Sequence, residues 1–188
     1  MPFFDMVWKY KTTFDGKEIY IMNDISKDYK ENPVGKSPSL SQVEMTELVL
    51  PNDTNLLGNL LGGRLMHWID IAGAMAASRH SNRIVATVAL DSLDFRHPAR
   101  MGELVMLKAK LTWVGKTSME VKVTAYAENL KTGSVILTNQ AYITFVALDS
   151  EGKPTPVPPL ILETEEEKRE FEEAEARRAE RLKRKEKG

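Results

Sequence analysis

The segment from Gly62 to His80, GGRLMHWIDIAGAMAASRH, constrains the fold more than any other part of the chain. A double glycine precedes a run that is long enough for about five helical turns and is apolar on nearly every face. We expect such a helix to be buried almost all round. Its second half consists mainly of alanine with Gly73, so a sheet or a partner helix can approach the backbone closely, which explains a glycine inside a helix.

Asp70 is the single acidic residue in this apolar run. Burying a lone carboxylate is unfavourable by several kcal/mol unless it is paired or protonated. An aspartate at this position therefore has either a structural partner, such as a cap or a buried ion pair, or a catalytic role. The residues alone leave both explanations open.

Length and composition narrow the class of protein. The 188 residues fit one domain with appendages, and the net charge of -1 gives no nucleic-acid footprint. The chain has no cysteine, which excludes disulfides, thiolate metal sites and thiol catalysis and suits a reducing compartment. Without a leader pattern or an apolar run of about 18 residues, we expect a cytoplasmic protein that has no membrane partner.

Alternating polar and apolar residues predict antiparallel strands on both sides of the helix. One strand is expected at 42–51, ended by Pro51, and the later ones at 84–95, 107–114, 118–128 and 134–148. The inward-facing residues expected in the middle two of these later strands are Leu107, Ala109, Leu111, Trp113, Met119, Val121, Val123, Ala125 and Ala127. One strand, a buried helix and four consecutive antiparallel strands predict an α+β hotdog fold, in which a sheet of about five strands wraps round the helix. Its open edge favours pairing of two subunits edge to edge.

The two ends of the chain differ from this central domain, which we place at 42–162. Residues 1–41 are predicted to be an N-terminal extension, with a hairpin from the strand-like pieces 6–11 and 18–24 and then a polar linker at 26–41. Residues 163–188 predict a charged helix, solvated and frayed at its end, with binding of a partner as the alternative. Thr164 and Glu167 form its capping box. Its expected i,i+4 pairs are Glu165–Arg169, Glu173–Arg177 and Glu180–Arg184.

Several motifs occur in an order that points to a known family. The stretch NDTNLLGNLLGGRLMHWIDIAGAMAASRH, followed by TVALDSLDFRHPARMGE, GKTSMEV and TFVALDSEGKPTPVP, resembles the hotdog-fold acyl-CoA thioesterases, the acyl-CoA hydrolase family. The tail PVPPLILETEEEKREFEE is similar to that of the vertebrate cytosolic, brain-type long-chain members. The resemblance implies hydrolysis of acyl-CoA to a fatty acid and coenzyme A, no separate cofactor, and a homo-oligomer built as a trimer of dimers.

The resemblance also implies which residues are catalytic. It matches Asp70 to the family's catalytic acid and Asn55 to an asparagine that contributes to a site shared across the dimer. Asp70 would act as general base or as nucleophile, with a small preference for activating water. The amides of Gly62 and Gly63, at the positive end of the helix, are candidate oxyanion donors. Judged alone, Asn55 is a turn residue and the glycines indicate only close packing.

Coenzyme A carries phosphates, which need cations and amides nearby. The resemblance implies that the turns at 95–100 and 116–118 face the nucleotide. Basic residues in surface turns are, however, commonly just solvated. The acyl chain would run between the helices of a dimer, along side chains that are equally plausible as core: Leu65, Met66, Trp68 and Ile69. The candidate coenzyme A residues are Phe95, Arg96, Arg100, Lys116, Thr117 and Ser118.

Two other functions are alternatives to hydrolysis. His67 lies one turn before Asp70, but hotdog dehydratases place their histidine before the helix, where this chain has Asn55, so a hydratase or dehydratase is disfavoured. His67, His80 and His97 are scattered, without the carboxylate cluster of a metal site. A non-catalytic acyl-CoA sensor or carrier ranks second, because residues 1–41 contain no helix-turn-helix pattern or basic stripe.

Overall fold

The computed structural model describes residues 10–14, 17–21 and 34–186. The chain divides into two units, residues 1–34 and 35–188. In the first, β1 (Tyr10–Phe14) and β2 (Lys17–Ile21) pair as an antiparallel hairpin, which confirms the predicted hairpin with different strand bounds. The predicted strand residues 6–9 and 22–24 lie outside the described residues.

The second unit begins at Gly35, ahead of the expected boundary at residue 42. Lys36 forms an isolated parallel β-bridge with Leu160. The short helix η2 (Pro38–Ser41) follows Lys36 in the chain. The Ser41 hydroxyl lies 3.1 Å from the buried His80 side chain at the end of the long helix. Residues 36–41 are therefore packed against the domain and are not the linker that their polar composition predicted.

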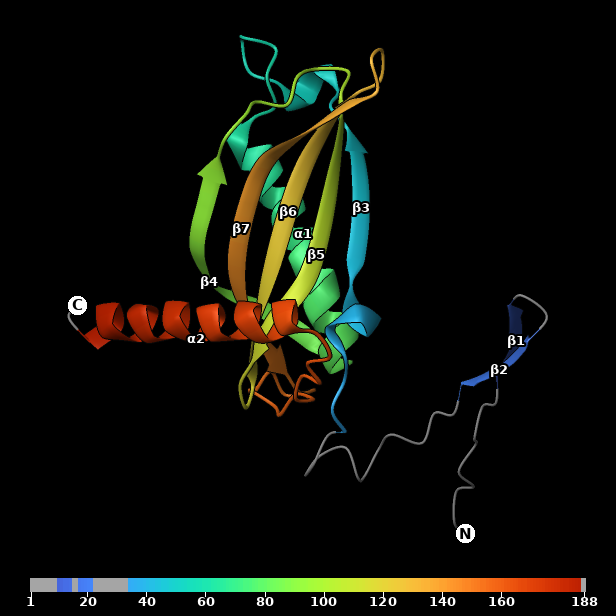
Figure 1. Cartoon of the computed structure of the whole chain (residues 1–188), viewed down its shortest axis with the longest axis vertical. Coiled ribbons are helices and arrows are strands. Elements are labelled where there is room, and N and C mark those ends of the chain that lie inside the picture. The colour runs from blue at the N-terminus through green and yellow to red at the C-terminus, as the bar shows by residue number, and fades with distance from the viewer. Residues whose placement is uncertain (1–9, 15–16, 22–33, 187–188) are drawn as a thin grey trace. The chain divides into compact units, whose positions relative to one another are not determined.

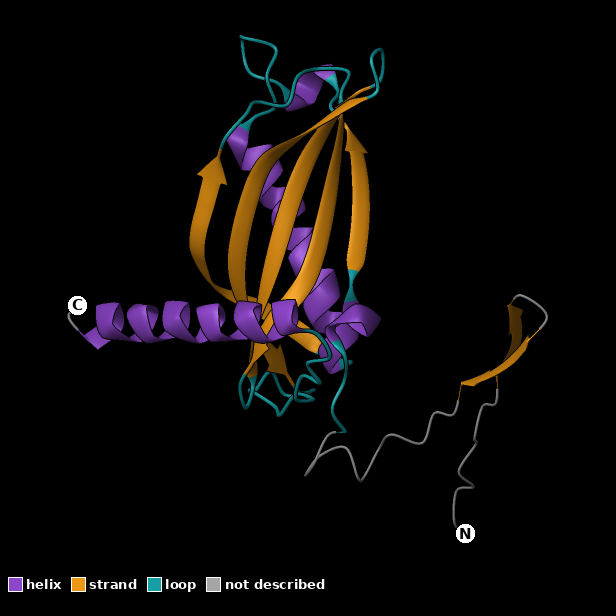
Figure 2. Cartoon of the chain, viewed as in Figure 1, coloured by secondary structure: helices purple, strands orange, loops and turns teal. Residues whose placement is uncertain are grey.

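The second unit is a five-stranded antiparallel sheet with a long helix, α1 (Gly62–Ser81), against one face (Figures 1 and 2). This arrangement confirms the hotdog prediction. The order in the sheet is β3-β5-β6-β7-β4, so β4 pairs with β7 at an edge and is not adjacent to β5. The strands are β3 (Val43–Leu48), β4 (Ile84–Phe95), β5 (Leu104–Val114), β6 (Ser118–Asn129) and β7 (Ser134–Leu148).

The small residues of α1 let the sheet approach the helix closely, as predicted. A Cβ atom at Gly73 would lie 3.0 Å from two ring atoms of Phe145 on β7, so the ring fills the space where a side chain would stand. The helix is not buried all round, however. Met66, His67 and Met75 are exposed in the single chain.

The inward-facing residues of β6 were predicted correctly, but one of those expected on β5 was not. A bulge between Leu111 and Trp113 shifts the alternation, so Trp113 pairs with Glu120 on the outer face and Val114 packs against the core. The Arg178 guanidinium lies 5.1 Å from the centre of the Trp113 ring. An extra residue in a strand reverses the faces of the residues that follow it.

The C-terminal helix α2 (Glu165–Glu186) crosses the face of the sheet opposite α1 (Figure 1). The prediction of a solvated helix is therefore wrong for the side of α2 that packs on the sheet, although most of its residues are exposed. The prediction of a half-solvated outer face of the sheet is wrong where α2 covers it. Lys122 on β6 binds Glu170 at 2.8 Å. Arg177 binds both carboxylate oxygens of Glu120, at 2.8 and 3.2 Å, and Arg181 binds Asp91 on β4.

The local features predicted for α2 are largely present. Its capping box is confirmed, because the Thr164 hydroxyl accepts from the Glu167 amide and the Glu167 carboxylate accepts from the Thr164 amide. Two of the three expected i,i+4 pairs occur, Glu173–Arg177 at 4.0 Å and Glu180–Arg184 at 3.8 Å. Arg169 pairs with Glu173 at 3.9 Å and Glu165 with Lys168 at 2.6 Å, in place of a pair with each other.

Candidate active site

The Asp70 carboxylate lies between α1 and the edge strand β4. Its Oδ1 accepts a hydrogen bond of 2.7 Å from the Thr87 hydroxyl. Both side chains line a cavity of about 190 Å³, and the residues that line the rest of it are apolar: Met66, Ile69, Leu90, Leu93 and Ile143. Asp70 therefore has a structural partner within the chain. This partner is a neutral hydroxyl, which orients the carboxylate but does not neutralise its charge. The second oxygen, Oδ2, makes no hydrogen bond within the described residues.

Thr87 was missed by the sequence reasoning. The segment was identified as a strand from its alternation and as part of a family motif, but a threonine is common in strands, so nothing in the motif singled this one out. A bulge between Thr87 and Ala89 interrupts the pairing of β4 with β7 directly after it. Bulges are frequent beside functional side chains, because they change the direction in which a side chain points.

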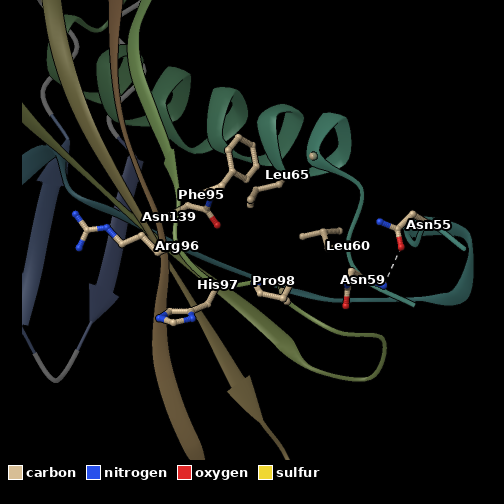
Figure 3. Close-up of a pocket in the computed structure, with 11 residues that line it drawn as sticks. Asn55, Asn59, Leu60, Leu65, Phe95, Arg96, His97, Pro98 and Asn139 are labelled. Atoms are coloured by element: carbon tan, nitrogen blue, oxygen red, sulfur yellow. Dashed lines mark hydrogen bonds between the residues drawn. The ribbon is translucent and has the colours of Figure 1, made fainter. Parts of the chain in front are cut away.

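A second cavity, of about 300 Å³, lies at the N-terminal end of α1 (Figure 3). Asn55, Gly62, Phe95, Arg96 and Asn139 are among the residues that line it, so three segments far apart in the sequence meet there. Asp70 is not among the lining residues. A single chain therefore places the candidate acid and the candidate asparagine in separate cavities.

Asn55 is held in a fixed orientation by its own loop. Its Oδ1 accepts hydrogen bonds from the Leu57 amide at 2.9 Å and the Asn59 amide at 3.2 Å, which is the turn role expected of an asparagine considered alone. Figure 3 shows the bond to Asn59. The side-chain Nδ2 has no hydrogen-bond partner among the described residues, so Asn55 presents a free donor.

Gly62 and Gly63 begin α1, and the preceding residue, Leu61, provides no side-chain cap. The amides of the first turn of a helix have no partner within the helix. A Cβ at Gly62 would meet only the Phe95 ring, at an ordinary 3.7 Å, and one at Gly63 would meet nothing within 4 Å. Close packing inside this chain therefore does not explain the two glycines, because a side chain at either position would not be crowded.

The candidate coenzyme A residues divide into two groups. Phe95, 61% exposed, and Arg96 lie at the second cavity, although the Arg96 side chain extends away from Asn55 (Figure 3). Arg100 lies in the turn that follows, where its amide donates to Glu103 at 2.9 Å. The second group is at the opposite end of the sheet, in and beside the turn between β5 and β6: Lys116, Thr117 and Ser118. One chain does not bring the two groups together.

The histidines play different roles in the domain. His80 is buried, and its Nε2 donates to the Pro158 carbonyl at 2.9 Å, while burial lowers the pKa of its ring. His67 and His97 are exposed. Within residues 34–186, no three acidic or histidine side chains form a group suited to a metal ion. Neither of the described long helices is apolar enough to cross a membrane.

Comparison with known proteins gives a consistent assignment. The model of the thioesterase superfamily matches residues 57–134. An acyl-CoA thioester hydrolase of Bacillus subtilis, itself uncharacterized, is 44% identical over 73% of this chain and 80% of its own length. The cytosolic acyl coenzyme A thioester hydrolase of Rattus norvegicus is 34% identical over 78% of this chain, which spans only 39% of the rat protein.

Solved structures agree in fold. A hexameric acyl-CoA thioesterase superposes with a TM-score of 0.78 at 43% identity, over 80% of this chain and 97% of the other. An acyl-CoA hydrolase of Staphylococcus aureus, solved with butyryl coenzyme A and coenzyme A, gives 0.75 at 36% identity, over 81% and 93%. Variants of the Staphylococcus aureus hydrolase with one Asp, one Asn or one Thr replaced by Ala have also been solved. The chain belongs to the acyl-CoA thioester hydrolase family and is a thioesterase.

Proposed function

We propose that the chain hydrolyses acyl-CoA thioesters to a free fatty acid and coenzyme A, with Asp70 as the general base. The observation that carries this is the Asp70 carboxylate, held by Thr87 at 2.7 Å beside an apolar cavity of about 190 Å³. Thr87 occupies one carboxylate oxygen, so the other is free to accept a proton from water. The apolar lining suits an acyl chain.

The reaction consumes one acyl-CoA and one water and needs no other reactant. The water oxygen attacks the thioester carbonyl carbon while Asp70 takes one of its protons, and the charge develops on the carbonyl oxygen. Collapse of the tetrahedral intermediate breaks the carbon–sulfur bond, and the proton held by Asp70 passes to the sulfur of coenzyme A. The alternative is direct attack by Asp70, which expels coenzyme A as its thiolate and forms an anhydride; water then hydrolyses the anhydride, and one of its protons passes to the thiolate.

Asn55 and the glycine amides serve the Asp70 of another subunit in this proposal. Gly62 precedes Asp70 by eight helical residues, which span about 12 Å, too far for both to contact one carbonyl group. Asn55 and Gly62 line the same cavity, so they act together. Their free donors, with the Gly63 amide, would stabilise the developing oxyanion and orient the substrate.

Spacing in a relative supports this set of residues. The Asp, Asn and Thr replaced in the Staphylococcus aureus variants stand at the same intervals along that chain as Asp70, Asn55 and Thr87 do here. We propose the same partners for hydrolysis in this chain. We also propose a hexamer, since a hexameric thioesterase superposes on this chain, and a cytoplasmic location.

The nucleotide of coenzyme A would bind near the second cavity. Phe95 offers a ring for stacking on adenine, and Arg96 and Arg100 offer cations for the phosphates. The turn that holds Lys116, Thr117 and Ser118 lies at the other end of the sheet, so those residues would reach a nucleotide bound to a different subunit.

Release of thiol from a panel of acyl-CoAs tests the proposal. We expect wild type to turn over and Asp70→Asn, folded equally well by circular dichroism, to lose at least about 100-fold in kcat. Glu44→Gln, which changes an exposed carboxylate on β3, is the control and should stay near wild type. If wild type and Asp70→Asn both bind acyl-CoA but neither releases thiol, the protein is a sensor or carrier.

A further inference from the structure

Two adjacent leucines in the loop before α1 are uncovered. Leu56 is fully exposed and Leu57 is 83% exposed, more than any other large apolar side chain in residues 34–186. An apolar pair in this state favours contact with another apolar surface. No described residue of the same chain provides that surface.

The loop that carries the leucines is fixed by its backbone. The Gly58 amide donates to the Asn55 carbonyl at 2.9 Å, and the Asn55 amide donates to the Asn59 carbonyl at 2.9 Å. The Met101 amide donates to the Gly58 carbonyl at 3.0 Å, which ties the loop to the turn before β5. Gly58 has a φ of 72°, which suits glycine at this bend. The leucines are therefore presented outward at defined positions.

The position of Asn55 limits where the leucines can lie in an assembled enzyme. Consecutive Cα atoms are about 3.8 Å apart, so the Leu57 Cα lies within about 7.6 Å of that of Asn55. If Asn55 reaches the Asp70 of another subunit, the leucines reach the mouth of the cavity beside that Asp70. Met66 and Leu90, which line this cavity, are 44% and 47% exposed in the single chain and so leave an apolar side uncovered.

We infer that Leu56 and Leu57 of one subunit form a wall of the acyl site of another and determine how strongly the enzyme favours acyl groups longer than acetyl. Leu56 and Leu57 directly follow Asn55 in the chain, so in this arrangement they contact the part of the acyl chain that extends beyond an acetyl group. This inference rests on the proposed function, because it takes Asn55 and Asp70 to act from different subunits.

The test compares kcat/KM for acetyl-, hexanoyl- and decanoyl-CoA in wild type, Leu57→Ala and the double variant Leu56→Ala/Leu57→Ala. We expect the double variant to lose at least about tenfold with the two longer substrates and to stay within about twofold with acetyl-CoA. Leu57→Ala should show the same trend to a smaller extent. The control Leu40→Ala changes a leucine in η2 that is 67% exposed and should leave all three values unchanged.

Two outcomes would overturn the inference. An equal loss with all three substrates, together with a smaller assembly by size-exclusion chromatography, would mean that the leucines only hold subunits together. Unchanged values would mean that they contact no acyl chain.

If wild type itself releases no thiol, the proposed function fails separately. Calorimetric titration with the thioethers S-methyl- and S-hexyl-CoA then decides, because the inference requires the double variant to weaken binding of the hexyl compound alone.

Discussion

Asp70 is positioned by one hydroxyl group, and that group comes from a different element. The helix places the carboxylate toward β4, and the bulged strand supplies the Thr87 hydroxyl at 2.7 Å. A hydrogen bond to a charged group is stronger than one between neutral groups, and it restricts the rotation of the carboxylate. The free oxygen thus keeps one direction relative to the cavity, which is what general-base catalysis on a bound water requires.

Replacing Thr87 separates the hydroxyl from the shape of the side chain. Thr87→Val keeps the shape and loses the donor, and we expect kcat to fall roughly 10- to 100-fold, because a hydrogen bond to a charged group is lost. Thr87→Ser keeps the donor and should stay close to wild type. Steady-state kinetics with one acyl-CoA measures both variants. We expect the loss in Thr87→Val to appear in kcat and not in KM. Equal activity of the valine and serine variants would show that the hydroxyl does not position Asp70.

At the scale of elements, α2 is attached to the sheet mainly through charges. Glu120 is only 2% exposed, and it accepts two hydrogen bonds from Arg177 and one of 2.7 Å from the Thr112 hydroxyl. The Arg177 guanidinium also lies 3.7 Å from the centre of the Tyr142 ring. Although burial raises the pKa of Glu170, Lys122 and Lys110 outweigh it and hold that pKa below the usual value. Acidification below about pH 4.5 therefore weakens the attachment, since protonation of Glu170 removes its pairs.

Replacing only one partner of the buried Glu120–Arg177 pair should lower the free energy of unfolding more than replacing both partners. We expect Arg177→Met to lower the free energy of unfolding by about 3 kcal/mol, because the Glu120 carboxylate stays buried without its partner. The double variant Glu120→Gln/Arg177→Met should lose much less, since no buried charge remains and Gln retains an acceptor for Thr112. Urea unfolding followed by circular dichroism measures both. A double variant that is as unstable as the single one would contradict this account of α2.

The features that could be predicted from the sequence are those that depend on residues close together in the chain. The capping box of α2 and the close approach at Gly73 were predicted because each depends on the size or spacing of residues within one element. The bond from Thr87 to Asp70 and the docking of Arg177 on Glu120 join residues far apart in the chain, so no local pattern marks them. Trp113 was assigned to the wrong face because the bulge on β5 depends on its pairing with β6.

At the scale of the whole molecule, the residues proposed for catalysis are divided between two cavities. Asp70 and Thr87 line one, while Asn55 and Gly62 line the other. The edge strand β4, which carries Thr87, has exposed apolar side chains at Ile84, Val88 and Leu90. An unpaired apolar edge favours association with a second copy. Joining two copies in a symmetric pair would then produce two complete sites, each with the acid of one subunit and the donors of the other.

Complementation between two inactive variants tests this central claim most directly. Asn55→Asp keeps an oxygen for the Leu57 and Asn59 amides but removes the side-chain donor, and Asp70→Asn removes the base. Each variant alone should be inactive. Co-expressed in equal amounts with different affinity tags, they should recover about a quarter of wild-type thiol release, because half of randomly formed pairs are mixed and each mixed pair has one intact site of two. A mixed assembly that is isolated through both tags and remains as inactive as its components would contradict a site shared between subunits.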